Sequence, residues 1–265
     1  MPGAQAPTFR AGVAGVRVNV LATERGRPLA GLTGDDFEVR DNGVLQQVEA
    51  TYGESEPLDV LFAFDRSQSM AGETLGRLGE AARAVLDQLG PDDRAGLVTF
   101  NQTFALQAPM STDRTTIRTA IAEIEPGGST SLRDTLYAAL TMLTTGGRRV
   151  LLLVFTDGFD STSWLPDRTV IETARESEAV VYAVPFVRPQ ERLLEEVAEA
   201  TGGRMVLADS DDRLRRVFLD VLREMRSRYV LTFTPTSAER GWHTLSVRLK
   251  KGDGRVTARP GYAVR

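Results

Sequence analysis

The chain has 265 residues, of which 42% are hydrophobic and 26% charged, the composition of a folded globular protein. It has no cysteine and a single histidine, His243, which excludes thiol catalysis, iron–sulfur clusters and zinc sites built from several Cys or His ligands. The net charge of −4 provides no basic field for nucleic acid, so we expect no nucleic-acid partner. Metal chemistry in this chain therefore requires oxygen ligands.

Membrane and export signals are absent from the sequence pattern. No apolar run approaches the roughly 18 residues that a membrane-spanning helix needs. The opening MPGAQAPTFRAG lacks the basic and then apolar order of a signal peptide. We expect neither kind of segment in the sequence given.

The first segment, 13–56, is predicted to be β structure. Val16, Val18 and Val20 alternate with polar residues, the period of a half-buried strand. Asn-Gly within residues 41–43 lies between two such runs and predicts a hairpin, because a type I′ turn needs positive φ at both central positions.

The middle segment, 57–228, alternates strands with helices. Its strands are continuous apolar runs, which is typical of a parallel sheet covered on both faces. This order predicts a doubly wound α/β fold. The predicted strands are 58–65, 95–101, 103–108, 148–157, 178–186 and 204–208, and the predicted helices are 70–90, 112–124, 131–143, near 167–178, near 190–200 and 209 to about 228.

The last segment, 229–265, returns to alternating β patterns separated by turns. Neither this segment nor 13–56 has enough apolar surface to be stable alone, so we expect the two to pack together as a small β-sandwich-like unit. The predicted fold is therefore α/β, with a doubly wound, mostly parallel central sheet in 57–228 and a sandwich built from the two flanks.

The string Asp65-Arg66-Ser67-Gln68-Ser69 stands at the carboxyl end of the first α/β strand. Ligands bind beyond such strand ends in open α/β sheets. Asp65, Ser67 and Ser69 would equally serve as helix caps, since their oxygens accept hydrogen bonds from free backbone N–H groups. Taken alone, this string is a weak signal.

Two other loops strengthen the prediction of a site. Thr130 precedes another helix, and Asp157 follows the most hydrophobic strand. Because adjacent parallel strands end at the same edge, three hydroxyls and two carboxylates converge into an all-oxygen octahedral site that suits Mg²⁺ or Mn²⁺. Ser129 is the alternative hydroxyl, but the Thr-x-Leu-x-Asp spacing favours Thr130. Because the hydroxyls are neutral, much of the positive charge of the ion stays uncompensated and can attract a carboxylate from another molecule.

Together these residues resemble the metal-ion-dependent adhesion site of the von Willebrand factor type A domain, over roughly 57–228. The order is D-x-S-x-S, then Thr, then T-D-G. The resemblance implies that Ser67, Ser69 and Thr130 contact the ion, and that Asp65 and Asp157 coordinate it directly or through water.

The flanking segments extend this resemblance. LTGDDFEVRDNG near the start, and YVLTFTP and ARPGYAVR near the end, are similar to the bacterial VWFA-related family named for Acidobacteria. That family implies an exported protein, so we expect a periplasmic or secreted location.

The leading functional hypothesis is a non-enzymatic recognition domain. It would bind a partner protein that presents Asp or Glu, through a bridging Mg²⁺ or Mn²⁺. One alternative is a metal-free scaffold that makes its contacts through the β flanks. A second is a Mg²⁺-dependent phosphoester hydrolase, although the sequence has no recognisable base, phosphate-binding loop or nucleophile elbow.

Four other acidic residues are weaker candidates. Asp160 is interpreted as a loop residue rather than a calcium ligand. Asp209, Asp211 and Asp212 stand where a helix begins, and acidic residues there complement the helix dipole.

Two aromatic residues and the histidine complete the candidates. Phe159 and Trp164 follow the third metal loop and would either form an apolar rim for a protein ligand or pack beneath the loop. His243 lies in a predicted strand far from every metal loop, and we expect a structural role for it.

Overall fold

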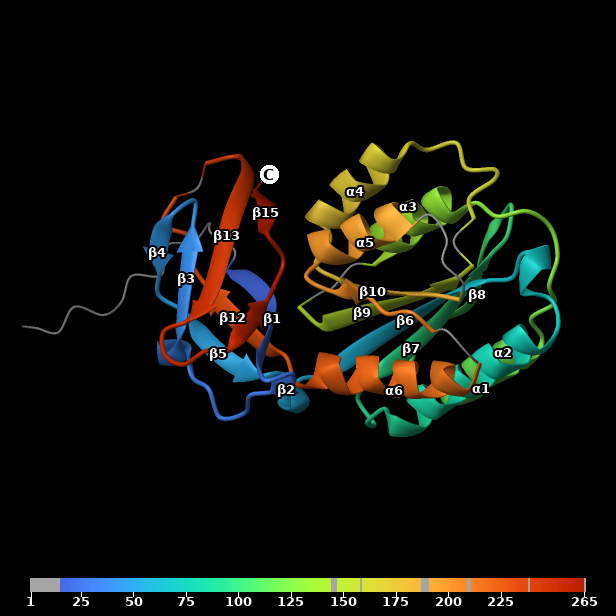
Figure 1. The fold of residues 1–265 in the computed structure, drawn as a ribbon, viewed down its shortest axis with the longest axis horizontal. Coiled ribbons are helices and arrows are strands. Elements are labelled where there is room, and N and C mark those ends of the chain that lie inside the picture. The colour runs from blue at the N-terminus through green and yellow to red at the C-terminus, as the bar shows by residue number, and fades with distance from the viewer. Residues whose placement is uncertain are drawn as a thin grey trace, which may run out of the picture.

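Strands that are apolar on both faces form the central sheet of the computed structural model, which describes residues 15–143, 147–157, 159–186, 191–208, 211–237 and 239–264. The strand order is β11-β10-β9-β6-β7-β8, and all neighbours are parallel except the β7–β8 pair. The doubly wound, mostly parallel fold predicted from the sequence is confirmed (Figure 1). The bounds are β6 (Leu58–Asp65), β7 (Arg94–Phe100), β8 (Phe104–Ser111), β9 (Arg149–Thr156), β10 (Val180–Pro185) and β11 (Arg204–Met205).

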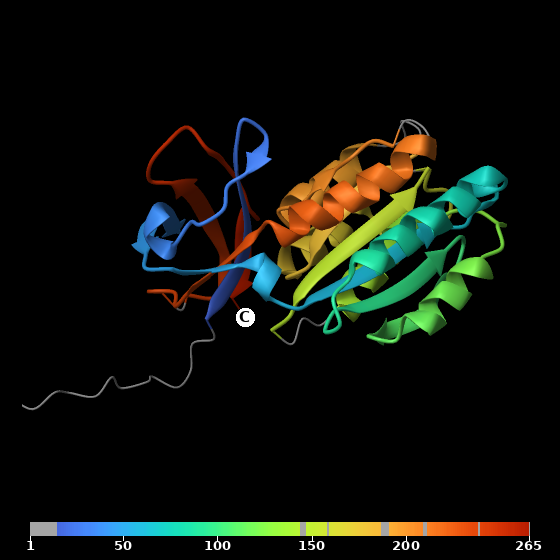
Figure 2. The ribbon, with the colours of Figure 1, turned by 90° about the horizontal axis from the view of Figure 1, so that it is seen from below.

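Six α-helices among the described residues cover the two faces of this sheet (Figure 2). Phe62 and Phe64 on β6 pack into the core beneath α1, α2 and α6, whereas Leu61 and Ala63 pack into the core beneath α3, α4 and α5. This alternation follows from the period of two of a strand. The helices are α1 (Glu73–Gln88), α2 (Arg114–Ala122), α3 (Leu132–Met142), α4 (Asp167–Glu176), α5 (Glu191–Ala200) and α6 (Asp211–Arg226).

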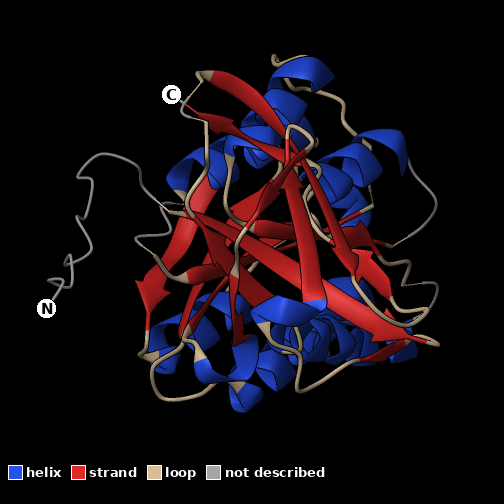
Figure 3. Cartoon of the chain, turned by 90° about the vertical axis from the view of Figure 1, so that its left-hand side faces the viewer, coloured by secondary structure: helices blue, strands red, loops and turns tan. Residues whose placement is uncertain are grey.

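The flanking segments form a β-sandwich beside the α/β layers (Figure 1), and it lies in front of those layers in the end view of Figure 3. One sheet has the order β14-β1-β12-β5, with β2 also paired to β1, and the other has the order β15-β13-β3-β4. The bounds are β1 (Val16–Glu24), β2 (Arg27–Pro28), β3 (Phe37–Asp41), β4 (Val44–Gln46), β5 (Glu49–Tyr52), β12 (Tyr229–Phe233), β13 (Gly241–Leu249), β14 (Arg255–Thr257) and β15 (Gly261–Val264).

Strands from the two ends of the chain pair directly within this sandwich. Val18 on β1 lies opposite Leu231 on β12, and Val39 on β3 lies opposite Val247 on β13. The two sheets share one apolar core. We retain the division into an N-terminal β segment 13–56, an α/β domain 57–228 and a C-terminal β segment 229–265 as a proposal about folding units.

The predicted hairpin is confirmed at the turn between β3 and β4. Asn42 has φ +46° and Gly43 has φ +83°, the two positive values that a type I′ turn requires.

Some element boundaries differ from those predicted. The helix predicted over 70–90 begins at Glu73, because Gln68–Met70 forms a short 3₁₀ helix and Gly72 has φ +100°. The predicted strand 204–208 is reduced to the two residues of β11, since only Arg204 and Met205 pair with β10.

The sandwich lies at the amino ends of the parallel strands. β5 leads through a 3₁₀ helix (Gly53–Ser55) into the start of β6, and α6 leads into β12. The carboxyl ends of β6 and β9 therefore face away from the sandwich (Figure 1). Among the described residues, no helix is long and apolar enough to cross a membrane.

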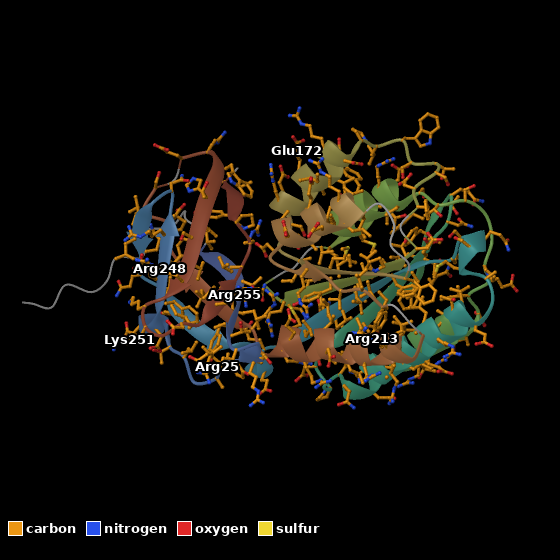
Figure 4. All side chains as sticks on the ribbon, in the orientation of Figure 1. Arg25, Glu172, Arg213, Arg248, Lys251 and Arg255 are labelled. Carbon is orange, nitrogen blue, oxygen red and sulfur yellow. The ribbon has the colours of Figure 1, made fainter. Side chains whose placement is uncertain are left out.

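Charged side chains are spread over both units (Figure 4). The labelled cations Arg25, Arg248, Lys251 and Arg255 lie on the sandwich, whereas Arg213 lies on α6 and Glu172 on α4. Arg248 forms an ion pair with Glu38 at 2.8 Å.

Candidate metal site

The candidate residues lie where the sheet changes its winding direction. From β6 the chain passes through α1 to β7 on one side, and from β9 it passes through α4 to β10 on the other side. Because β6 and β9 are neighbours, the loops that leave them diverge at their carboxyl ends, the usual ligand position in such sheets.

A chain of hydrogen bonds joins four of the five predicted residues. Asp65 Oδ1 accepts a hydrogen bond from the backbone N–H of Ser67 at 2.8 Å. The hydroxyl oxygens of Ser67 and Ser69 are 3.1 Å apart, and Ser69 Oγ in turn donates to Asp157 Oδ2. Asp65, Ser67 and Asp157 are buried, with at most 8% of each residue exposed.

Backbone hydrogen bonds hold the Thr130 loop beside the serine loop. Gln68 N–H donates to the carbonyl of Gly128 at 2.9 Å, and Gly127 N–H donates to the carbonyl of Arg66 at 2.8 Å. Thr130 itself is 5% exposed. The two loops are therefore fixed side by side, and coordination by the Thr130 hydroxyl stays a prediction.

The third loop, which carries Asp157, is attached to the Thr130 loop. The carbonyl of Thr130 accepts hydrogen bonds from the backbone N–H groups of Ser161 and Thr162 at 2.9 and 3.1 Å, and from the Thr162 hydroxyl at 3.0 Å. Asp157 Oδ1 accepts from the backbone N–H of Phe159 at 3.2 Å. All three loops thus form one hydrogen-bonded surface.

Electrostatic repulsion between carboxylates is part of this surface. Burial raises the pKa of Asp65 above its ordinary value, and the neighbouring Asp157 carboxylate acts in the same direction. Hydrogen bonds from Ser67 and Thr156 oppose the shift. A cation placed between the two carboxylates would relieve the repulsion.

The donor set fits a small, hard cation. Mg²⁺ prefers oxygen ligands in an octahedron at about 2.0–2.1 Å, so neighbouring ligands stand about 2.8–3.0 Å apart. The 3.1 Å between the oxygens of Ser67 and Ser69 matches that spacing. Within the described part of the chain, no three His, Cys, Asp or Glu side chains gather as a metal cluster, so any cation here depends on hydroxyl ligands.

Comparison with known proteins identifies the family. The model of the von Willebrand factor type A domain matches residues 59–219. The chain belongs to the von Willebrand factor type A (VWA) family.

Individual relatives are distant. A UPF0353 protein of Mycolicibacterium gilvum is 25% identical over 198 residues, which cover 61% of this chain and 58% of the relative, so the chain spans less than two thirds of that protein's length.

Two solved structures share the VWA fold. A von Willebrand factor type A structure from Catenulispora acidiphila has a TM-score of 0.58 at 12% identity and covers 89% of this chain and 74% of its own. Proximal thread matrix protein 1 of the mussel byssus, solved with a zinc-occupied MIDAS motif, has a TM-score of 0.58 at 19% identity, over 69% and 49% of the two chains.

Sequence reasoning missed several residues that support the site of the VWA domain. The Thr156 hydroxyl donates to Asp65 Oδ2 at 2.7 Å. Asn101 Nδ2 donates to the carbonyl of Gly127 at 2.8 Å, and Gln102 Oε1 accepts from the backbone N–H of Ser129 at 3.1 Å. Each of these residues lies at or just after the carboxyl end of a strand. That position in the sequence could have identified them as candidates to support the site.

The structure also places most of the weaker candidates. Asp160 has a 3% exposed side chain and accepts hydrogen bonds from Ser163 and from the backbone N–H of Arg133, the role of a loop residue. Phe159 and Trp164 are 61% and 94% exposed, so they do not pack beneath the loop.

The structure does not describe four of the residues named in the sequence analysis. Asp209 and Gly158 lie outside the described residues, and the side chains of Asp211 and Asp212 are likewise not described.

His243 is buried in the sandwich, as expected of a structural residue. Its Nδ1 lies 2.8 Å from Asp41 Oδ1, and its Nε2 lies 2.8 Å from the carbonyl oxygen of Glu239. The Tyr262 hydroxyl donates to the other oxygen of Asp41. The hydrogen bond to Glu239, followed by the interaction with Asp41, raises the pKa of His243.

Proposed function

We propose that this VWA domain is a recognition module that binds an acidic side chain of a partner protein through a bridging divalent cation. The observation that carries the proposal is the convergence of Asp65, Ser67, Ser69 and Asp157 through successive hydrogen bonds at one end of the sheet. Thr130 completes the proposed ligand set of five.

In this proposal the cation, Mg²⁺ or Mn²⁺, supplies an open coordination position that takes a carboxylate from outside. Asp65 and Asp157 neutralise the ion only formally, and the hydroxyls of Ser67, Ser69 and Thr130 add no charge. A third carboxylate therefore replaces water with a strong, directional contact. The chain's own contribution is to hold the oxygens in place before the ion arrives.

A hydrolase is less well supported by the same geometry. His243 is the single histidine of the sequence, and both of its ring nitrogens face acceptors inside the sandwich. It cannot reach the carboxyl ends of β6 and β9 as a general base. A metal-free scaffold is the remaining alternative, and it predicts no effect of metal on binding.

The first test is Mg²⁺ titration followed by thermal unfolding. At about ten times its dissociation constant, Mg²⁺ should add roughly 1.4 kcal/mol to the free energy of unfolding, a rise in Tm of about 3–6 °C. Asp157→Ala should abolish the rise. The matched control is Asp87→Ala, an exposed carboxylate on α1 whose loss should leave the rise intact.

The second test addresses the partner. A protein captured from an envelope fraction should be released by EDTA and should not be captured by Asp157→Ala. Retention of the same partner in EDTA would contradict the proposal and favour the scaffold. We also propose a location outside the cytoplasm, from the resemblance to exported bacterial relatives, and cell fractionation tests it.

A further inference from the structure

Two exposed aromatic side chains follow Asp157 in the loop between β9 and α4. Trp164 is 94% exposed and Phe159 is 61% exposed. A tryptophan that is buried removes about 150–250 Å² from water, yet in this chain Trp164 leaves nearly all of that surface in solvent. The second tryptophan, Trp242, differs, because it is 40% exposed and lies 5.6 Å from the guanidinium of Arg175.

The backbone beneath Trp164 is held firmly. The carboxylate of Asp134, in the first turn of α3, accepts hydrogen bonds from the backbone N–H groups of Trp164 at 3.1 Å and of Leu165 at 3.0 Å. The buried carboxylate of Asp160 binds the hydroxyl of Ser163 at 2.6 Å. The exposed indole therefore stands on a fixed loop, which lowers the entropy lost when a partner covers it.

The same loop is joined to the candidate metal site at two places before Trp164. Phe159 donates its N–H to Asp157, and residues 161 and 162 donate theirs to the carbonyl of Thr130. Asp134 lies in the first turn of α3, four residues after Thr130 in the chain. The backbone of Trp164 is thus anchored to the helix that begins two residues after a proposed metal ligand.

Charges around the loop are compatible with an acidic partner. The guanidinium of Arg133 pairs with Asp160 at 3.3 Å and with Asp167 at 2.6 Å. Asp134 is engaged by the two backbone N–H groups described above. Asp134, Asp160 and Asp167 are therefore paired or hydrogen-bonded within the protein, and they offer less repulsion to an approaching carboxylate than free carboxylates would.

We propose that Trp164, assisted by Phe159, determines which acidic ligands bind, by selecting a peptide segment in which the metal-binding Asp or Glu is followed closely by an apolar side chain. The acidic residue completes the cation site and the apolar residue packs on the indole. This inference rests on the proposed function, and it adds the chemistry that separates one acidic partner from another.

The test uses a displayed library of short random peptides, selected on the full chain in Mg²⁺. Wild-type selections should be enriched in Asp or Glu with an apolar neighbour. Trp164→Ala should keep the acidic residue, lose the apolar enrichment and bind a wild-type-selected peptide about 30-fold more weakly. Trp164→Phe should restore part of the affinity, and Leu45→Ala, which trims a 56% exposed side chain on β4, should change nothing.

Fluorescence locates the contact directly. In a Trp242→Phe background, Trp164 is the only tryptophan, so a selected peptide should shift its emission to the blue whereas Mg²⁺ alone should not. Acidic enrichment without an apolar neighbour, or equal selections on Trp164→Ala, would overturn this inference and leave the proposed function intact. Failure to select any EDTA-sensitive acidic peptide would overturn both.

A lipid surface is the competing occupant of an exposed tryptophan. Vesicles of phosphatidylcholine and phosphatidylglycerol should leave the emission of Trp164 unchanged. A blue shift with vesicles that does not depend on Mg²⁺ would replace the peptide proposal with membrane contact.

Discussion

Arg149 is expected to hold the sandwich and the α/β layers together, and Arg149→Met should weaken that junction. Arg149 is the first residue of β9, and only 2% of its surface is exposed. The guanidinium donates to Asn19 Oδ1 on β1 at 3.2 Å, to the carbonyl of Gly53 at 2.7 Å and to the carbonyl of Met225 in the last turn of α6. One side chain thus joins β1, the linker before β6 and the last helix.

The magnitude follows from two opposing contributions. Burial lowers the pKa of Arg149 from 12.5 to about 10, so keeping the charge in the folded state costs about 3 kcal/mol. Three hydrogen bonds from a charged donor contribute about 1.5–3 kcal/mol each. The hydrogen bonds therefore exceed the cost of burial, and Arg149→Met should lower the free energy of unfolding by about 2–6 kcal/mol.

The assay is urea denaturation followed by two signals. Far-UV circular dichroism reports the α-helices, which among the described residues all belong to the α/β layers, and in a Trp164→Phe background the fluorescence of Trp242 reports the sandwich. The two transitions should coincide in the wild type and separate in Arg149→Met, because the junction has lost its shared donor. Arg168→Met, which removes an exposed guanidinium on α4, should change stability by less than about 0.5 kcal/mol.

One result would refute this reasoning. If Arg149→Met were as stable as the wild type, with coincident transitions, the buried charge would cost as much as its hydrogen bonds contribute. The two units would then be held together by apolar packing alone.

Three further predictions concern a buried histidine, a buried aromatic ring and a glycine in the metal-site loop. The pKa of His243 is raised in the folded state, so its contribution to stability should be complete below about pH 6.5 and should be lost as pH rises through the folded value; urea midpoints from pH 6 to 9 should show a decline that His243→Gln lacks. Phe218→Ala on α6, where the ring is fully buried, should cost about 3–5 kcal/mol, whereas Phe159→Ala should cost little. Gly128→Ala, at φ +80°, should cost about 1 kcal/mol and weaken Mg²⁺ binding measured by calorimetry, because the new Cβ would displace Gln102 from the loop.

Local patterns were sufficient to predict much of this protein. The apolar runs of β6 and β9 predict buried parallel strands, and the Asn-Gly pair predicts a type I′ hairpin, because each depends on a few adjacent residues. Asp65, Ser67 and Ser69 are predicted as a group for the same reason, since one strand end positions all three. The VWA family follows from their order with the later loops.

Contacts between distant segments were decided by the tertiary structure alone. Arg149 is one of 32 basic residues, and its neighbours in the sequence do not indicate that its guanidinium is buried. Its hydrogen-bond acceptors include Asn19, 130 positions earlier in the chain, and Met225, 76 positions later. Trp164 could equally have packed beneath its loop, and the hydrogen bonds of Asp134 to that loop fix its backbone while the indole remains exposed. Sequence periodicity reports which face of an element is apolar. It carries no information about which remote donor or acceptor will meet a given side chain, because that depends on how whole elements pack.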